Sequence, residues 1–239
     1  MDMVLYEKPL RVELVGSNLF VNGGRHPRSV RTLAQMRKVM MGFNEDASPI
    51  ELYYMYRSVY VNGDIRFDIT VIPALAVGGE CAKTHGHYHP GSEDGLAYPE
   101  VYQVLRGNAA FILQKKNRNG SVDAMVIDAR DGDVVLLPPG WGHVSVNKGE
   151  TTLVLSNLVY DRFESLYGDY EESQGAAYYY TKDGEIVQNT NYIVQKNEHL
   201  SAKELNEKYG FACKDLLSEF QAEPKRFEFL KKPKSMFKS

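Results

Sequence analysis

Three of the six histidines lie close together, in the segment Thr84-His85-Gly86-His87-Tyr88-His89-Pro90. On an extended strand, residues two apart share a face, so His85, His87 and His89 are expected to point the same way. Three imidazoles make a poor apolar core, because each brings a polar nitrogen that needs a partner when it is buried. A single histidine is usually an ordinary surface or core residue. The triplet instead favours a transition-metal site, for which imidazole is the commonest ligand.

Two further candidate ligands, Glu100 and His143, stand in recognisable spacings. Glu100 is followed after six residues by Gly107. The second spacing is the series Gly132, Pro138, Gly140, His143 and Asn147. Both frames resemble the two sequence motifs of the cupin superfamily. The resemblance implies that the histidine segment, Glu100 and His143 together hold a metal ion.

Spacing alone leaves the histidine pair open. The His-x-His element can be read as His85 with His87 or as His87 with His89. Ten residues separate His89 from Glu100, which is longer than the usual cupin spacing.

A closer resemblance rests on several stretches of the chain. They are Ser29-Val30-Arg31-x-Leu33, Gly63-Asp64-Ile65-x-Phe67, Thr84-x-Gly86-His87-x-His89, Pro99-Glu100-Val101-Tyr102 and Pro138-Pro139-x-Trp141-x-His143. Together they span about Ser29 to Gly168 and resemble the cupin-type glucose-6-phosphate isomerases of archaea and some bacteria.

This resemblance implies one divalent metal ion per chain, with iron as the first choice and manganese, nickel or zinc as alternatives. The implied ligands are His87, His89, Glu100 and His143, and His85 is expected to lie beside them without binding the ion.

The resemblance also implies roles for other side chains. Glu100 and Tyr102 are the expected catalytic residues. The phosphate of the substrate is expected to contact Tyr53, Thr70, Thr84, Tyr167 and the backbone N–H of Gly86. Two positions depart from the family pattern, because Val159 and Ser165 stand where a tyrosine and a histidine are usual. The departures concern proton transfer, and they leave a related sugar phosphate open as the substrate.

The implied reaction is the interconversion of glucose 6-phosphate and fructose 6-phosphate, a step of glycolysis and gluconeogenesis. Three imidazoles and one carboxylate leave open positions on the ion, where a sugar carbonyl and its neighbouring hydroxyl can be polarised. The alternative is a cupin that acts on or binds a different sugar or small ligand. Such a protein would be a metal-dependent dioxygenase or a non-catalytic sugar-binding protein with the same ligands.

The elements that must position these residues read as short strands. β-Branched and aromatic runs bounded by turn residues occur at Leu52–Tyr56, Ile65–Val71, Val101–Leu105, Ala110–Gln114, Ala124–Ile127, Val134–Leu137 and Leu153–Leu158. This spacing predicts a mainly β protein with an antiparallel sandwich or barrel. With the resemblance, the expected fold is a cupin double-stranded β-helix, or jelly-roll, barrel. Strand alternation places Glu100, Tyr102 and Val104 on one inward face.

Both ends of the chain differ in sequence pattern from the strand-rich middle. Apolar residues at helical spacing predict a short helix within Ser29–Gly42. Ser201 and Glu204 form a capping box, and Lys214–Phe220 indicates a second short helix. The expected division is an N-terminal arm and helix at residues 1–50, the cupin barrel at 51–190, and a partly helical, basic extension at 191–239.

Composition narrows the class of protein. The 28 Lys and Arg against 31 Asp and Glu give a net charge of −3, which argues against a nucleic-acid partner. We read the C-terminal lysines as a solvated tail. No apolar run approaches the length of a membrane span, and Met1–Leu10 does not resemble a signal peptide. Two cysteines in dissimilar contexts favour a reducing compartment. We expect a cytoplasmic homodimer whose partner is a phosphorylated sugar.

Overall fold

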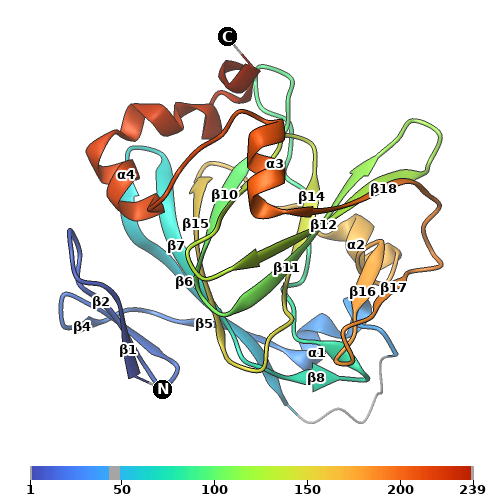
Figure 1. Ribbon diagram of the computed structural model, residues 1–239, viewed down its shortest axis with the longest axis horizontal. Coiled ribbons are helices and arrows are strands. Elements are labelled where there is room, and N and C mark those ends of the chain that lie inside the picture. Colours follow the sequence, from blue (N-terminus) through green and yellow to red (C-terminus); the bar gives the residue numbers. More distant parts are fainter. Residues whose placement is uncertain (1, 43–48, 238–239) are drawn as a thin grey trace.

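A computed structural model describes residues 2–42 and 49–237 of the chain (Figure 1). Met1 and residues 43–48, which belong to the expected N-terminal arm, and Lys238 of the basic tail lie outside the described residues. In the described part, strands dominate, and two sheets enclose the main core.

A six-stranded antiparallel sheet forms one wall of the core, in the order β13-β10-β15-β7-β6-β5. Its strands are β5 (Ser29–Thr32), β6 (Glu51–Asn62), β7 (Ile65–Ile72), β10 (Glu100–Arg106), β13 (Val134–Leu137) and β15 (Leu153–Tyr160). Valine, isoleucine and tyrosine are frequent in them, as suits a pleated and largely buried surface.

A four-stranded sheet forms the other wall, in the order β14-β11-β12-β18. Its strands are β11 (Asn108–Lys116), β12 (Val122–Arg130), β14 (Gly142–Asn147) and β18 (Val194–Ser201). The first three pair antiparallel, whereas β18 runs parallel to β12.

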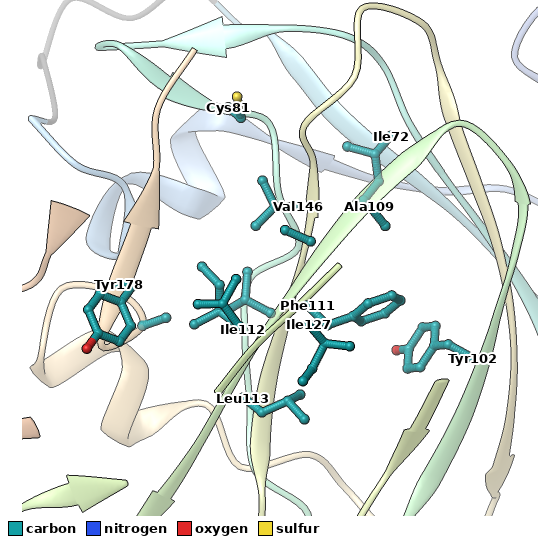
Figure 2. Close-up of a cluster of buried hydrophobic side chains, with 14 of the residues drawn as sticks. Ile72, Cys81, Tyr102, Ala109, Phe111, Ile112, Leu113, Ile127, Val146 and Tyr178 are labelled. Atoms are coloured by element: carbon teal, nitrogen blue, oxygen red, sulfur yellow. The ribbon is translucent and has the colours of Figure 1, made fainter. Parts of the chain in front are cut away.

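The two sheets face one another across a shared apolar core, part of which is drawn in Figure 2. Phe111 and Ile127 come from the four-stranded sheet, and Ile72 and Tyr102 come from the six-stranded sheet. Full burial of such side chains contributes about 1.5–3 kcal/mol each. The predicted mainly β jelly roll is confirmed. It is a sandwich of two sheets with separate ladders rather than one closed barrel.

The outer face of the six-stranded sheet is covered by both ends of the chain (Figure 1). The covering elements are a small sheet of β1 (Asp2–Tyr6), β2 (Val12–Val15), β3 (Asn18–Val21) and β4 (Gly24–Arg25), and the C-terminal helices α4 (Leu216–Ala222), η2 (Pro224–Leu230) and η3 (Pro233–Phe237). Leu14, Phe67 and Phe220 meet in one buried cluster on this face. Sequence analysis did not predict the small sheet.

The predicted helix within Ser29–Gly42 is only partly correct. Ser29–Thr32 form β5, and the helical part is limited to α1 (Leu33–Met36) and the 3-10 turn η1 (Arg37–Val39). Thr32 is the N-cap residue of the helix, and its N–H donates to Gln35 Oε1 at 3.0 Å. The residues before the cap are partly β-branched, which favours an extended backbone. They pair with β6 and therefore form a strand.

The C-terminal extension is helical only after a strand. Val194–Ser201 form β18, which sequence analysis missed because most of its residues are polar and exposed. Helix α3 (Ala202–Lys208) follows its N-cap residue Ser201. The Oγ of Ser201 accepts a hydrogen bond from the N–H of Glu204 at 3.3 Å, so the predicted capping box is confirmed. The second predicted helix is α4, capped by Asp215. The division at residues 190 and 191 stays a prediction.

Short elements complete the fold: β8 (Ala76–Val77), β9 (Glu80–Cys81), α2 (Gly168–Glu172), β16 (Tyr178–Tyr180) and β17 (Ile186–Gln188). Among the helices of the described residues, none has the length and apolar character needed to cross a membrane.

Strand β10 turns its alternate residues as predicted. Tyr102 and Val104 belong to the cluster between the two sheets, whereas Val101 belongs to the outer cluster. Tyr102 stands opposite Asn157 on one neighbouring strand and Val135 on the other. A shift of one residue would reverse every side chain of β10, so pairing on both sides fixes the direction of its inward groups.

A buried ion pair anchors the segment that leads from β9 to the histidines. The side chains of Glu80 and Lys83 are almost completely buried, and Lys83 Nζ lies 2.5 Å from Glu80 Oε1. Lys83 Nζ also donates to the carbonyl oxygen of Val39 at 2.6 Å. Glu80 Oε2 accepts from the N–H of Met41 at 2.8 Å. The pair therefore joins this segment to the turn after α1.

We predict that Lys83→Met lowers the free energy of unfolding by about 3–5 kcal/mol, because it leaves the Glu80 carboxylate buried without its partner. Urea unfolding followed by circular dichroism measures the loss. Lys203→Met is the matched control, since the exposed Lys203 pairs with Glu207 at the surface. It should change the same quantity by less than about 1 kcal/mol. Equal stability of the two variants would contradict the anchoring role.

Candidate metal centre

Four potential metal ligands meet between the sheets. One ligand atom from each of the following residues lies within 4.8 Å of the other three: His87, His89, Glu100 and His143. Glu100 opens β10 and His143 lies on β14, whereas both other histidines come from the segment between β9 and β10. Residues distant in the sequence thus form one cluster.

The histidine segment is held by single backbone bridges and does not form a strand. The N–H of His87 donates to the carbonyl oxygen of His143 at 3.3 Å, and the reverse bond measures 3.0 Å. The backbone at Gly86 has a φ of +83°, which L-residues rarely adopt, and this interrupts the extended chain. The predicted strand is therefore not formed, although His85, His87 and His89 all line the same cavity.

His85 lies outside the cluster. Its Nε2 is 3.5 Å from Glu171 Oε1, and its ring meets the ring of Tyr167 edge-on with centroids 5.0 Å apart. Of the two readings of the His-x-His element, the geometry brings together the pair of His87 with His89.

Hydrogen bonds to the ligand side chains orient their metal-binding atoms toward the centre of the cluster. His89 Nδ1 lies 2.9 Å from the carbonyl oxygen of Tyr98, so Nδ1 donates and Nε2 faces inward. Asn157 Nδ2 donates to Glu100 Oε1 at 2.7 Å. The other oxygen, Glu100 Oε2, is buried and has no hydrogen-bond partner among the described residues. It lies 3.4 Å from Nε2 of His89 and 3.4 Å from Nε2 of His143.

The residues present fit a divalent cation. A buried carboxylate oxygen without a donor is costly, and the Nε2 atoms of His87 and His89 converge to 3.1 Å. Three imidazoles with one carboxylate suit iron, manganese, nickel or zinc. A cation among these atoms would satisfy the unpaired oxygen and the converging nitrogen lone pairs together.

Burial sets the charge of the four groups. Desolvation lowers the pKa of His89 to about 4, and it holds the pKa values of His87 and His143 well below their usual range. The same effect raises the pKa of Glu100 to about 8. The imidazoles are therefore neutral, which is the form that binds metals, whereas the Glu100 carboxyl loses a proton when a cation binds.

A cavity opens onto the cluster and contains most of the predicted phosphate contacts. Tyr53, Thr70, Thr84 and Tyr167 all line it. Thr84 Oγ1 accepts from the N–H of Ser145 at 2.9 Å, which leaves its own O–H to donate to a ligand. The role of these hydroxyls in phosphate binding stays a prediction.

Gly86 is not among the described residues that line the cavity. A Cβ at this position would lie 2.6 Å from the ring of Tyr170 and 2.6 Å from Val144 Cγ2. Close approach and positive φ together account for glycine here. Its predicted contact with phosphate stays a prediction.

Tyr102 lies beside the cluster. Its hydroxyl is 3.3 Å from His143 Nε2. Burial and the neighbouring Glu100 carboxylate raise the pKa of Tyr102 well above its usual value. The phenol therefore stays protonated and can act as a hydrogen-bond donor in the cavity.

Three charged residues of the cavity were missed by sequence analysis. They are Arg57, Arg66 and Asp68. The signal was available for two of them, because Arg66 and Asp68 alternate with Thr70 on β7 and share its inward face.

The two residues that depart from the family pattern are also part of the site. Val159 and Ser165 both line the cavity. Tyr160, one residue further on, is not among the described lining residues, and its ring lies against Tyr98 with centroids 4.8 Å apart. Strand alternation on β15 thus separates Tyr160 from Val159.

The family model and the relatives that match this chain carry the same description. Residues 43–197 match the family model described as glucose-6-phosphate isomerase (GPI). The chain is 26% identical over 190 residues to the glucose-6-phosphate isomerase of Thermococcus litoralis, which covers 76% of this chain and 94% of that one. It is 29% identical over 158 residues to the enzyme of the same name from Pyrococcus furiosus, covering 63% and 78%.

Solved structures show only weak similarity. An oxalate decarboxylase of Bacillus subtilis is 20% identical with a TM-score of 0.34, over 48% of this chain and 27% of that chain. An oxalate oxidase in complex with glycolate is 14% identical with a TM-score of 0.33, over 44% and 46%. Scores this low do not bear on function.

We predict that the cluster binds one divalent ion per chain and that His85 takes no part. His143→Ala removes a ligand and should lower the metal content after desalting by about tenfold or more. His85→Ala is the control and should keep the ion. Mass spectrometry of metal content makes the comparison. Loss of the ion from His85→Ala but not from His89→Ala would contradict the assignment.

Metal binding should also depend on pH. The metal-free Glu100 carboxyl is protonated below a pKa of about 8, so binding at neutral pH should release about one proton. The metal affinity should then rise by about tenfold per pH unit up to that pKa and level off above it. Calorimetry in buffers of different ionisation enthalpy counts the protons. Glu100→Gln should release none, and an equal release from both proteins would refute this source of the proton.

Proposed function

Because the family model matches more than half of the chain, the chain belongs to the glucose-6-phosphate isomerase family of enzymes, and we propose that it interconverts glucose 6-phosphate and fructose 6-phosphate with one divalent metal ion. One observation carries the proposal. Three of the four candidate ligands, His87, His89 and Glu100, line a cavity that is also lined by hydroxyls suited to a phosphate. Metal and phosphate contacts in one cavity are what a small phosphorylated sugar requires.

Aldose–ketose isomerisation moves hydrogen between C1 and C2 and develops negative charge on their oxygens. A divalent ion held by His87, His89, Glu100 and His143 supplies Lewis-acid polarisation of the carbonyl and the adjacent hydroxyl. The neutral imidazoles leave most of the ion's charge available for this. We propose iron as the ion, and manganese, nickel or zinc suit the same donors.

Two residues of the site are proposed to transfer the proton and to stabilise the developing charge: the ligand Glu100 and the neighbouring Tyr102. Asn157 holds Glu100 Oε1, which fixes the plane of the carboxylate next to the reacting carbons. We assign Glu100 as the general base. Tyr102 stays protonated at neutral pH because of its raised pKa, and its O–H donates to the developing oxyanion.

The phosphate is proposed to bind to Tyr53, Thr70, Thr84 and Tyr167, which line the same cavity. Hydroxyl donors hold a dianion more weakly than charged donors, but they do so without an ion pair that must be desolvated. Thr84 precedes His87 by three residues, so one segment carries both a phosphate contact and a metal ligand. Binding energy from the phosphate can therefore position C1 and C2.

A related sugar phosphate is the second candidate substrate. Val159 and Ser165 line the cavity where the family pattern has a tyrosine and a histidine. Valine cannot exchange a proton and serine does so poorly at neutral pH, so another group would have to move the proton between the sugar oxygens.

By family membership we also propose a cytoplasmic homodimer that acts in glycolysis and gluconeogenesis. Light scattering at micromolar concentration measures the mass, and a monomer would contradict the dimer.

We predict that the metal-loaded protein converts fructose 6-phosphate in a coupled assay and loses this activity when stripped of metal. Thr84→Val keeps the side-chain shape but removes a donor. It should lower kcat/KM for fructose 6-phosphate about ten- to a hundredfold, or about 1–3 kcal/mol, with unchanged metal content. Thr190→Val, at an exposed position, is the matched control and should keep full activity.

Other results of this assay would point elsewhere. Oxygen consumption with iron bound and no action on fructose 6-phosphate would indicate a dioxygenase. Equal rates with free fructose and its 6-phosphate would show that the phosphate contacts are not where we place them.

A further inference from the structure

The cavity contains a charged pair that the proposed mechanism does not use. Arg57 on β6 and Asp68 on β7 both line it. Asp68 is 4% exposed. Because a carboxylate this deeply buried must be hydrogen-bonded, its partners show which of its acceptor sites are still open.

Three donors are hydrogen-bonded to Asp68. Its Oδ1 accepts from the N–H of Ser58 at 2.7 Å. Its Oδ2 accepts from Arg66 Nε at 2.8 Å and from Arg57 Nη1 at 3.4 Å. A carboxylate has about four acceptor sites, so these donors from the described residues leave one for a ligand.

Arg57 is held much more loosely than Arg66. Its side chain is 47% exposed. Apart from the 3.4 Å contact with Asp68, its guanidinium has a 3.6 Å contact with Met55 Sδ. Arg66, by contrast, pairs with both Asp68 and Asp161. Most of the N–H donors of Arg57 are therefore available to a ligand.

Sheet register relates Asp68 to both parts of the proposed site. It stands two residues before Thr70 on the same face of β7, about 7 Å along the strand. Across the sheet it faces Asn157 of β15. Asn157 in turn donates to Glu100 Oε1. Asp68 thus lies near a predicted phosphate contact along β7 and, through Asn157, near a candidate metal ligand across the sheet.

We propose that Arg57 and Asp68 form a hydroxyl-binding subsite that holds the middle of a linear sugar phosphate and selects its configuration at C3 and C4. The proposal rests on the proposed function, because C1 and C2 at the metal and the phosphate near Thr70 place the remaining carbons over this pair. Asp68 accepts a hydrogen bond from one hydroxyl, and Arg57 donates to its neighbour. One acceptor beside several donors complements a vicinal pair of hydroxyls.

Asp68 also supports the backbone, and the test must separate the two roles. Ser58, which donates to Asp68, lies in a bulge of β6 with a φ of +57°. Loss of this support would lower stability and weaken all ligands alike. The side chain of Arg57 has no bond to Ser58 in the described structure, so Arg57 variants leave the hydrogen bond between Ser58 and Asp68 in place. Metal content is measured as well, because the charge of Arg57 also acts on Glu100.

Calorimetry on the metal-loaded protein uses two probes, D-glucitol 6-phosphate as a linear non-reacting polyol phosphate and inorganic phosphate. Arg57→Gln and Asp68→Asn should each weaken glucitol 6-phosphate about tenfold or more and leave inorganic phosphate and metal content unchanged. Asp161→Asn is the matched control. It removes a carboxylate from the same Arg66 but is not among the described lining residues, so it should bind both probes as wild type does.

Turnover gives a second readout. The ratio of kcat/KM for fructose 6-phosphate over its C4 epimer, tagatose 6-phosphate, should fall about tenfold in Arg57→Gln. Unchanged binding of glucitol 6-phosphate in both variants would overturn the proposal, as would equal weakening of both probes in Arg57→Gln. If wild type turns over neither sugar phosphate, the proposed function fails. The binding experiment still decides whether the subsite exists.

Discussion

The site depends on one carboxylate oxygen, Glu100 Oε2, which is buried among three imidazoles and has no hydrogen-bond partner in the part of the chain that the structure describes. This oxygen is almost inaccessible to solvent, and the other oxygen of the same carboxylate is held by Asn157. The raised pKa of Glu100 expresses what this burial costs in the absence of a cation. A bound cation offsets that cost only in the folded chain, so metal binding and folding are thermodynamically coupled.

The rest of the fold holds the other ligand atoms around that oxygen. Glu100 and His143 come from strands in opposite sheets, and their register is fixed by pairing. The histidine segment has no strand of its own, and it is fastened at both ends instead. The buried Lys83 ion pair secures its start, and the carbonyl oxygen of Tyr98 orients His89 near its end. Rigid support of this kind keeps ligand geometry within the narrow limits that metal sites require.

Local patterns were enough to predict the strands that carry Glu100 and its inward direction, because alternation along a paired strand is a local property. The strand predicted through the histidines is absent because Gly86 has a positive φ, and the non-local packing of Tyr170 against Gly86 that accompanies it cannot be read from the local sequence. Strand β18 could not be predicted from the local sequence either. Its partner β12 lies far earlier in the chain, and its polar residues give no apolar alternation. Asp68 was overlooked although its parity with Thr70 was readable.

Strand β18 also has a consequence for how the folded chain meets other copies of itself. An exposed strand edge invites open-ended pairing with another chain, and charged side chains discourage it. On the β12 side, that edge is β18, whose exposed residues include Lys196, Glu198 and His199. The opposite edge, β14, is fully buried and is covered by the bridge between His87 and His143. The segment that carries two of the metal ligands therefore also covers this edge, and its release would expose β14 to pairing with another chain.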